Sequence, residues 1–378
     1  MKKDILSLFI NFTAVICICV LTVRALPFLP GDTGELYAEK TAQASMLYRN
    51  IFADNFEKAE NNNNTAEEDA KESEQVIQRE DSDPYSDIAQ TPKDIEALME
   101  AETKAIENQE QKGKTSEEEY FGGGTLVSHG NVEVQSKIPD SFYALDIEAL
   151  LGEGADLSIK DYSEPTVLVY HSHTTESYTL LDAGYYTESF DLRSEDSGKN
   201  MIRVGNELCD YLEKQGIGVI HDTEIHDSSY NDSYNNSRLS VEKYLEEYPS
   251  IEITIDLHRD DITYEDGTKV KPTAVVNGKK AARMMLIAGC EYGRVENFPD
   301  WEYNLRFDLA VQKKAADMYE GLMRPILFSE RKYNMFETKN SFLLEIGTDA
   351  NTLDEACYSA RLFATALGEV IKDYTKDD

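Results

Sequence analysis

The segment Ile251–Leu257 constrains the fold most. It alternates aliphatic side chains with polar ones, which is the period of a half-buried β-strand. The segment before it, Ser240–Tyr248, has the apolar spacing of a helix and stops at Pro249. Strand-like and helix-like segments continue to alternate along the chain to its C-terminus. This alternation is typical of an α/β domain, so we predict a mainly parallel sheet flanked by helices.

The other expected elements are short apolar runs and longer amphipathic segments. We expect strands over Leu126–Val134 (a pair with a turn at its centre), Thr166–Tyr170, Ile217–Ile220, Thr273–Val276, Met284–Gly289 and Phe342–Ile346. We expect helices over Phe142–Leu151, Asn200–Gln215, Asn304–Met323 and Thr352–Tyr374.

The N-terminal residues have a different character. Ile5–Val23 carries no charge and follows Lys2 and Lys3. As a helix it would extend roughly 28 Å, close to the ~30 Å hydrocarbon core of a bilayer. We therefore predict a cytoplasmic stub and transmembrane signal anchor in residues 1–24, with the remainder of the chain outside. A cleaved signal peptide is the competing interpretation. Residues 25–56 are expected to form a juxtamembrane segment.

A strongly acidic region separates the two parts of the chain. Residues 57–119 contain 20 acidic and 7 basic side chains and a run of four asparagines. Such a composition buries too little apolar surface to offset the entropy of ordering the chain. We predict a disordered acidic linker there, ending at the glycines 122–124, and a catalytic domain over residues 120–378.

Composition excludes one class of partner. The 378-residue chain has a formal net charge of −35, whereas nucleic-acid binding requires clustered Lys and Arg. Two of the five cysteines, Cys17 and Cys19, lie in the apolar N-terminal segment. Because Cys209, Cys290 and Cys357 are widely spaced, we expect buried free thiols rather than a disulfide framework or a cysteine zinc site.

Histidines and carboxylates accompany three of the expected strands. The first apolar run opens into His171, His173 and Glu176, His258 follows the second, and Glu345 lies within the last. Ligands of α/β sheets gather beyond the carboxyl ends of the strands, so these groups can meet at one site. Imidazole and carboxylate ligands with a further acid for proton transfer indicate a zinc hydrolase.

Each of these residues also has a structural interpretation. His258 could be a hydrogen-bonding residue at a strand end, and Glu345 could form an ion pair with Arg259. The carboxylate ligand could be Glu176 or, ahead of the helix at Asn200, Asp196. A cluster of the form His-x-His-x-x-Glu also resembles a surface metal-binding loop.

Three ordered blocks resemble the signature of the SpoIIP family, the stage II sporulation protein P of endospore-forming bacteria. They are Tyr170–Tyr178, Asp256–Asp260 and Leu344–Leu353, with Asn277–Lys280 between the second and third. The resemblance runs from about Tyr120 to the C-terminus. Members of the family are similar to zinc-dependent N-acetylmuramoyl-L-alanine amidases, so the resemblance implies an amidase-like fold.

The resemblance also implies roles for single residues. The first ligand of the amidases follows the first strand, a position that His173 matches best, with His171 as its rival. The second imidazole corresponds to His258, and the catalytic glutamate of the last strand corresponds to Glu345.

The third ligand is less clearly matched. In the amidases it is a glutamate just before the first long helix. The spacing differs here, and Asp196 is the nearest candidate at that position. Glu176 is favoured because it belongs to the tight histidine cluster.

The function that the resemblance implies is peptidoglycan hydrolysis during engulfment, by amidase and also endopeptidase activity. It further implies action with the lytic transglycosylase SpoIID and the membrane protein SpoIIM. The anchor predicted above suits an extracytoplasmic domain of the mother-cell membrane that faces the septal space. The alternative is a scaffold that binds peptidoglycan and partner enzymes without cutting.

Overall fold

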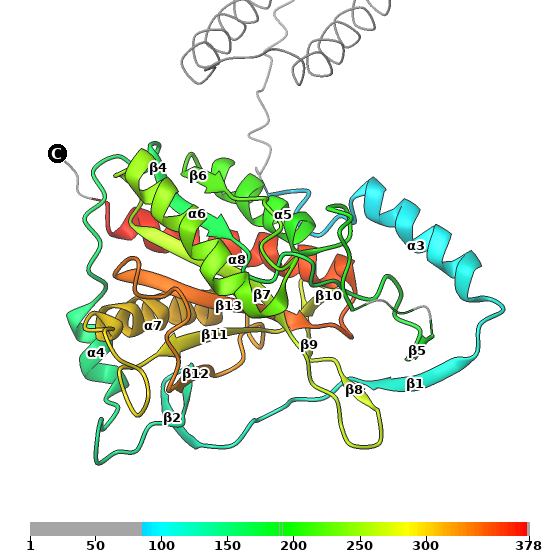
Figure 1. Ribbon diagram of the computed structural model, residues 1–378, viewed down its shortest axis with the longest axis horizontal. Helices are drawn as coiled ribbons and strands as arrows, with labels where there is room; N and C mark the ends of the chain where they lie inside the picture. The colour runs from blue at the N-terminus through cyan, green and yellow to red at the C-terminus, as the bar shows by residue number, and fades with distance from the viewer. Residues whose placement is uncertain (1–84, 189, 191, 376–378) are drawn as a thin grey trace, which may run out of the picture. The chain divides into compact units, whose positions relative to one another are not determined.

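An eight-stranded sheet organises the residues described by the computed structural model, namely 85–188, 190 and 192–375 (Figure 1). Its strand order is β2-β3-β12-β11-β13-β7-β4-β6. The strands are β2 (Thr125–His129), β3 (Val132–Ser136), β12 (Ile326–Ser329), β11 (Met284–Gly289), β13 (Asn340–Thr348), β7 (Ile253–Asp260), β4 (Pro165–Tyr170) and β6 (Gly218–His221).

The sheet is mixed and mainly parallel, as the sequence predicts. The pairs β3–β12, β12–β11, β13–β7, β7–β4 and β4–β6 are parallel. The pairs β2–β3 and β11–β13 are antiparallel. Because β4, β7 and β13 run in the same direction, their carboxyl ends lie at the same edge of the sheet. The three segments that carry the predicted site residues therefore converge there.

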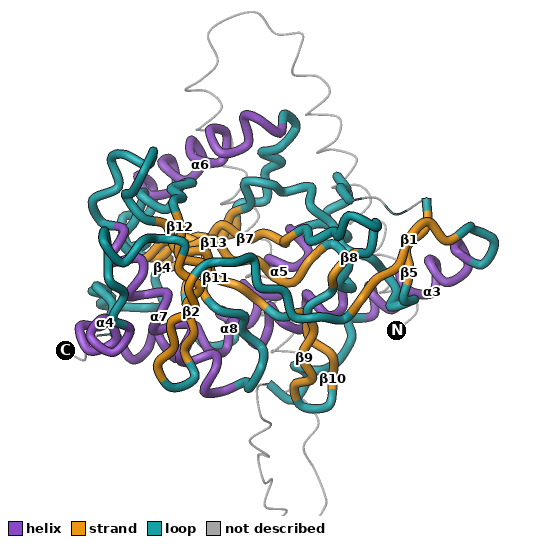
Figure 2. Tube along the Cα trace, turned by 90° about the horizontal axis from the view of Figure 1, so that it is seen from below, coloured by secondary structure: helices purple, strands orange, loops and turns teal. Residues whose placement is uncertain are grey.

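Helices cover the two faces of the sheet unequally. Helices α5 (Met201–Glu213), α7 (Trp301–Met318) and α8 (Leu353–Asp373) lie on one face, and α6 (Ser233–Glu247) lies on the other (Figure 2). Helix α8 begins with a capping box formed by Thr352 and Glu355, and almost all of it is buried. Helix α4 (Ile147–Glu153) precedes β4 and contacts α7.

The main core lies between the sheet and the three-helix layer. Alternate residues of the central strands point into it, including Ile255, Leu257, Phe342 and Leu344, which are all inaccessible to solvent. The residues between them point to the opposite face, because successive side chains of a strand alternate in direction. On that opposite face, α6 packs over Leu168 and Tyr170 of β4. No described helix continues this layer over β11 and β12.

The prediction of a disordered linker over residues 57–119 is wrong for its second part. Residues 93–106 form helix α3 (Lys93–Ile106), and residues 111–116 form strand β1 (Gln111–Ser116). Ile95 is fully buried, with Leu98 and Met99 packed nearby on the same helical face. This i, i+3, i+4 spacing was a helix signal that the acidic composition of the region obscured. Residues 57–84 lie outside the described part.

Polar contacts attach this segment to the α5–α8 side of the domain. Asp94 accepts a hydrogen bond from Nε of Arg203 at 2.7 Å. Arg361 of α8 donates from Nε to the carbonyl oxygen of Ile88 at 2.8 Å. Tyr211 donates its hydroxyl to Asp87 at 2.7 Å. Residues 85–119 are thus ordered by tertiary contacts that composition cannot reveal.

Two small sheets complete the described fold. Strand β1 pairs with β5 (Tyr185–Thr187) and β8 (Lys269–Val270), and β9 (Thr273–Val276) pairs with β10 (Lys279–Ala282) as a hairpin. The sequence predicts β9 but not β10, and a turn at Asn277–Gly278 joins the two strands. Both turn residues have positive φ, which their residue types tolerate.

Most other expected boundaries lie close to the observed ones, with three differences. Helix α6 begins at Ser233, seven residues before the expected start, and α4 begins at Ile147 rather than Phe142. Helix α7 ends at Met318 rather than Met323. Cys209, Cys290 and Cys357 are buried free thiols, as predicted. The expected membrane anchor and juxtamembrane segment lie outside the described residues. Among the helices that are described, none combines the length and the apolar character needed to cross a bilayer.

Candidate functional site

The polar cluster sits on the sheet face opposite the main core. In the β7–β13 register His258 pairs with Glu345, and Asp256 lies two residues before His258 on the same face. The flanking residues Leu257 and Leu344 point into the core on the other face. Strand alternation alone therefore separates the apolar from the ionisable side chains along these two strands.

The chain reaches the same place again as it leaves β4. A tight turn follows the strand, in which the Glu176 amide donates to the carbonyl oxygen of His173 at 3.1 Å. The hydroxyl of Thr174 donates to the carbonyl oxygen of His171 at 2.9 Å. This turn brings the Glu176 carboxylate to His258, with Oε2 3.3 Å from Nδ1.

His258 lies between two carboxylates. Its Nε2 is 2.8 Å from Oδ1 of Asp256, and its Nδ1 faces Glu176. Asp256 also accepts hydrogen bonds from the amide and hydroxyl of Ser172, at 2.8 and 2.6 Å. Burial alone would lower the pKa of His258, but Asp256 and Glu176 raise this pKa well above its usual value.

Glu176 is ionised in this setting. Burial alone would raise its pKa, but the hydrogen bond and charge of His258, together with the charge of Arg259, lower the pKa to about 2. The backbone amide of Arg259 also approaches Oε2 of Glu176 at 3.3 Å. Glu176 is therefore a buried, ionised carboxylate of the kind that can serve as a metal ligand.

His173 completes the cluster. Its ring centroid is 5.3 Å from that of His258, and the two rings are nearly perpendicular. Tyr230 stacks on His173 at 4.6 Å, and Tyr234 meets it edge-on at 5.4 Å. Burial, followed by the neighbouring charge of His258, lowers the pKa of His173. Its Nδ1 is buried without a hydrogen-bond partner, which is an uncommon condition for a polar atom and indicates an absent partner.

Glu345 occupies the adjoining position on β13. Its Oε2 is also buried without a hydrogen-bond partner. Burial, followed by the negative charge of Asp260, raises its pKa to about 8, although the charges of His258 and Arg324 oppose the shift. Glu345 does not pair with Arg259, whose guanidinium donates instead to the carbonyl oxygens of Ser177 and Leu192 at 2.8 and 2.7 Å.

The donor set fits a divalent zinc-like cation. It consists of a buried unpartnered imidazole nitrogen, an ionised carboxylate and a second imidazole whose far nitrogen is fixed by Asp256, an arrangement common behind metal-binding histidines. Within residues 85–375, apart from positions 189 and 191, no three His, Cys, Asp or Glu side chains are already gathered as a complete metal centre. The fit therefore rests on the chemistry of the donors His173, Glu176 and His258.

His171 lies apart from this cluster. Its Nδ1 contacts the carbonyl oxygen of Leu257 at 3.1 Å, and its Nε2 lies 2.9 Å from Nε2 of His221. The pair packs beside Gly205 of α5, where an added Cβ would come within 3 Å of both rings. Both nitrogens of His171 are thus engaged on the helix side of the sheet.

The other acidic and histidine candidates lie away from this cluster or have partners of their own. Asp196 is largely exposed and interacts with the amide of Gly198 at 2.9 Å and with Lys199 at 3.6 Å, so Glu176 is the carboxylate beside the histidines. His221 is the last residue of β6 and is partly buried, and His226 lies in the loop that follows this strand. His226 is buried with its Nε2 2.9 Å from Oδ2 of Asp222.

Sequence reasoning missed the groups that support the site. Asp256 was discoverable, because it lies two residues before His258 in a strand and must share its face. The aromatic residues Tyr230, Tyr234 and Tyr333 gave no such signal. Tyr234 stacks on Tyr333 at 4.9 Å and approaches His258 at 6.4 Å, contacts that only the folding of α6 over the sheet creates.

A groove of about 420 Å³ begins at Glu345 and is lined by Met285, Ile287 and Leu327. Tyr333 also lines it and has φ of 43°, a conformation that is strained for a bulky residue and is found mostly where function requires it. Glu345 thus lines a groove that is open to the surface.

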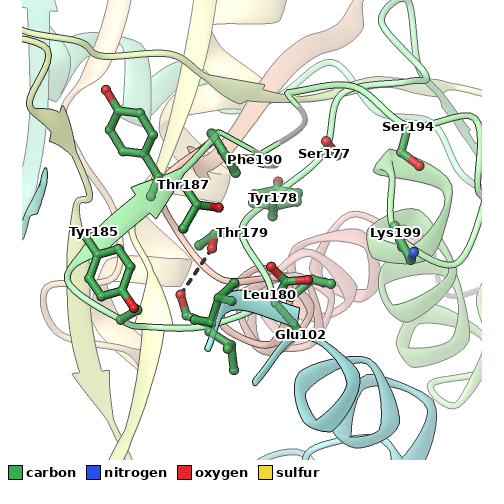
Figure 3. Close-up of a pocket in the computed structure, with 14 residues that line it drawn as sticks. Glu102, Ser177, Tyr178, Thr179, Leu180, Tyr185, Thr187, Phe190, Ser194 and Lys199 are labelled. Carbon is green, nitrogen blue, oxygen red and sulfur yellow. Dashed lines mark hydrogen bonds between the residues drawn. The ribbon is translucent and has the colours of Figure 1, made fainter. Parts of the chain in front are cut away.

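A second cavity of about 210 Å³ lies between the loop after Glu176 and helix α3 (Figure 3). Tyr178, Tyr185, Phe190, Lys199 and Glu102 are among the residues that line it. None of the predicted catalytic or ligating residues lines this cavity.

Comparison with known proteins identifies the family. The model of the family "Stage II sporulation protein P (SpoIIP)" matches residues 38–368. The chain belongs to the SpoIIP family. It is 29% identical over 283 residues to the stage II sporulation protein P of Bacillus subtilis (strain 168), an alignment that covers 68% of this chain and 67% of that protein.

Several solved structures resemble part of this SpoIIP chain. The amidase AmiC2 of Nostoc punctiforme is 12% identical with a TM-score of 0.31, covering 55% of this chain and 96% of that chain. The CwlD amidase of Clostridioides difficile, solved with the GerS lipoprotein, is 12% identical with a TM-score of 0.33, covering 55% and 98%. The family assignment rests on the family model and the sequence relative, not on these partial likenesses.

Proposed function

We propose that this SpoIIP protein is a peptidoglycan hydrolase, a zinc-dependent N-acetylmuramoyl-L-alanine amidase with endopeptidase activity. The observation that carries the proposal is the convergence of His173, Glu176 and His258 beside Glu345 at the mouth of a groove. A buried carboxyl with a raised pKa next to a metal-compatible donor set is a combination suited to hydrolysis of an amide bond.

His173, Glu176 and His258 would hold the zinc ion, which supplies Lewis acidity and lowers the pKa of a bound water. Asp256 accepts the Nε2 proton of His258, so Nδ1 would become available to the cation once it has lost its own proton. The amide of Arg259 holds the Glu176 carboxylate in place. The contacts of Asp256 with His258 and of Arg259 with Glu176 hold these two ligands in position before the cation binds.

Glu345 would carry the proton. It faces the groove beside His258, and a nearby cation lowers the pKa of a carboxyl from the raised value of about 8. The ionised form then accepts a proton from the attacking water, and the protonated form returns it to the leaving amine. A pKa near the operating pH suits both directions of transfer.

The remaining parts of the proposal extend the family resemblance. We propose membrane anchoring through the N-terminal segment, with the domain in the extracytoplasmic space of the mother cell, and cooperation with SpoIID and SpoIIM. The proposed substrates are the amide bond between N-acetylmuramic acid and L-alanine and the peptide crosslinks.

The test is digestion of purified peptidoglycan by the full chain with chelator, with added zinc and with neither. Mass spectrometry would identify the products. Free stem peptides that disappear with chelator and return with zinc would support the amidase. Binding to peptidoglycan without cleavage under every metal condition, including with SpoIID present, would contradict it and favour a scaffold.

A further inference from the structure

The groove runs across four strands on the face of the sheet opposite the main core. Glu345 of β13 pairs with Met285 of β11, and on the same face Leu327 of β12 pairs with Gln135 of β3. Three steps between neighbouring strands correspond to roughly 14 Å. An extended peptide of about four residues has this length. The groove thus has room for a short peptide whose first bond lies at Glu345.

The floor and the rim of this groove differ in chemistry. Met285, Ile287 and Leu327 form an apolar floor, on which the aliphatic parts of a peptide would pack. The rim at the end away from Glu345 contains two exposed cations, Lys137 after β3 and Arg331 after β12. A neutral peptide would leave both cations without a partner.

Apart from Glu345, the other ionisable acidic and basic side chains that line the groove, Asp260, Asp261 and Arg324, have ion-pair partners. Asp260 pairs with Arg324 at 3.0 Å. Asp261 approaches Lys269 at 3.5 Å. Within the described residues, the side chains of Lys137 and Arg331 form no ion pair and no hydrogen bond. The groove therefore has two uncommitted positive charges at one end, although the whole chain carries a net charge of −35.

From this arrangement, and on the basis of the proposed function, we propose that Arg331 and Lys137 form a carboxylate-recognition subsite for the stem peptide. Arg331 would bind a free carboxylate of the peptide through its planar guanidinium, and Lys137 would add a second charge. The subsite selects stem peptides with free carboxylates over those whose carboxylates are amidated. Both residues position the substrate and take no part in proton transfer.

The binding experiment uses the full chain carrying Glu345→Gln, in which turnover should be slower by about 10²–10⁴-fold. The two probes are N-acetylmuramoyl-L-alanyl-γ-D-glutamyl-L-lysine and the same molecule with both free carboxylates amidated. Calorimetry should show about tenfold tighter binding of the acid, the size expected for a charge-assisted hydrogen bond. Adding Arg331→Ala should abolish this preference, and Arg331→Lys should restore most of it.

Lys332 provides a matched control. It is the next residue, but its Nζ donates to the carbonyl oxygen of Glu296 at 3.0 Å and it does not line the groove. Lys332→Ala should therefore keep the full preference for the acid. In the active protein, Arg331→Ala should raise KM for the acid probe and leave kcat unchanged, because the contact is the same in substrate and transition state.

Equal affinity for the two probes would overturn this inference, and so would a preference that persists in the Arg331→Ala/Lys137→Ala double variant. Failure to bind either probe would overturn it as well. The proposed function is judged separately, by cleavage with the wild-type chain. Cleavage of both probes at equal efficiency would support the proposed hydrolase activity and contradict the carboxylate subsite. A carboxylate-dependent affinity without cleavage would support the subsite and contradict the hydrolase.

Discussion

Two histidine pairs, separated by the thickness of one sheet, differ in how their nitrogen atoms are used. His171 pairs with His221 on the side of the three-helix layer, and both nitrogens of His171 have partners. His173 lies near His258 on the other side, and its Nδ1 has no partner. The ring nitrogens of His171 and His221 all have partners within the protein, whereas Nδ1 of His173 remains available to bind a ligand.

The difference shows why residue type and spacing do not define a metal site. His171 and His173 are two positions apart in one cluster, yet the turn after β4 directs them to different surroundings. Beside His171 are Gly205 and His221, and beside His173 are Tyr230 and His258. His258 of the second pair contacts two carboxylates, Asp256 and Glu176, whereas the ring contacts of the first pair join the two imidazoles, a carbonyl oxygen and the side-chain oxygen of Asn206. Electrostatic surroundings therefore separate a structural pair from a candidate ligand pair.

The largest expected effect concerns the acid beside the second pair. Glu345→Gln should lower the rate of muropeptide cleavage by about 10²–10⁴-fold, because the amide cannot transfer the proton. The melting temperature should be unchanged or higher, since a costly buried ionisable group is removed. Turnover assays and thermal unfolding of the same preparation would check both. Cleavage at the wild-type rate would show that Glu345 is not the proton carrier.

Replacing one histidine of each pair with alanine tests the comparison between the two pairs. His173→Ala should abolish stoichiometric zinc binding, measured by calorimetry, and abolish cleavage with it. His171→Ala should leave the zinc stoichiometry at its wild-type value and instead destabilise the fold by about 1–3 kcal/mol, because His221 loses a buried partner. Denaturant unfolding measures the second effect. The opposite pattern would assign the metal to the His171 pair.

A smaller effect is expected at the residue that orients His258. Asp256→Asn should weaken zinc affinity by about 10–100-fold, because Asp256 fixes the imidazole through Nε2. Asp196→Asn is the matched control, since Asp196 is largely exposed and remote from the histidines. Competition with a chelator of known affinity would measure both variants. An unchanged affinity in Asp256→Asn would remove Asp256 from the site.

The smallest effect is a pH dependence of the first pair. Burial lowers the pKa of His221 to about 4, whereas an unfolded histidine titrates near 6.5. The unfolded chain therefore binds the extra proton between these values, so the contribution of neutral His221 to stability is complete above pH ~6.5 and is lost as the pH falls towards 4. Relative to His221→Asn, the unfolding free energy of the metal-free wild type should fall over that window. A constant difference between the two proteins would contradict the neutral, buried assignment.

The sequence by itself determined the α/β class, most strands and helices, and the family. These follow from local periodicity, since the alternation in Ile251–Leu257 specifies a strand whatever surrounds it. The sequence also singled out His258, Glu345 and the cluster after β4, because ionisable groups at the ends or within apolar strands are costly unless they are used.

Only the tertiary structure decided which of these residues lie together. The proximity of His173 and Glu176, rather than His171 and Asp196, to His258 depends on a turn and a register between segments about 80 residues apart in sequence. The order of residues 85–119 likewise depends on contacts such as Arg203 with Asp94. Local sequence determines which face of a strand is apolar. Long-range packing determines which residues lie against that face. Those neighbours decide whether a polar atom has a partner within the protein or remains available for a ligand.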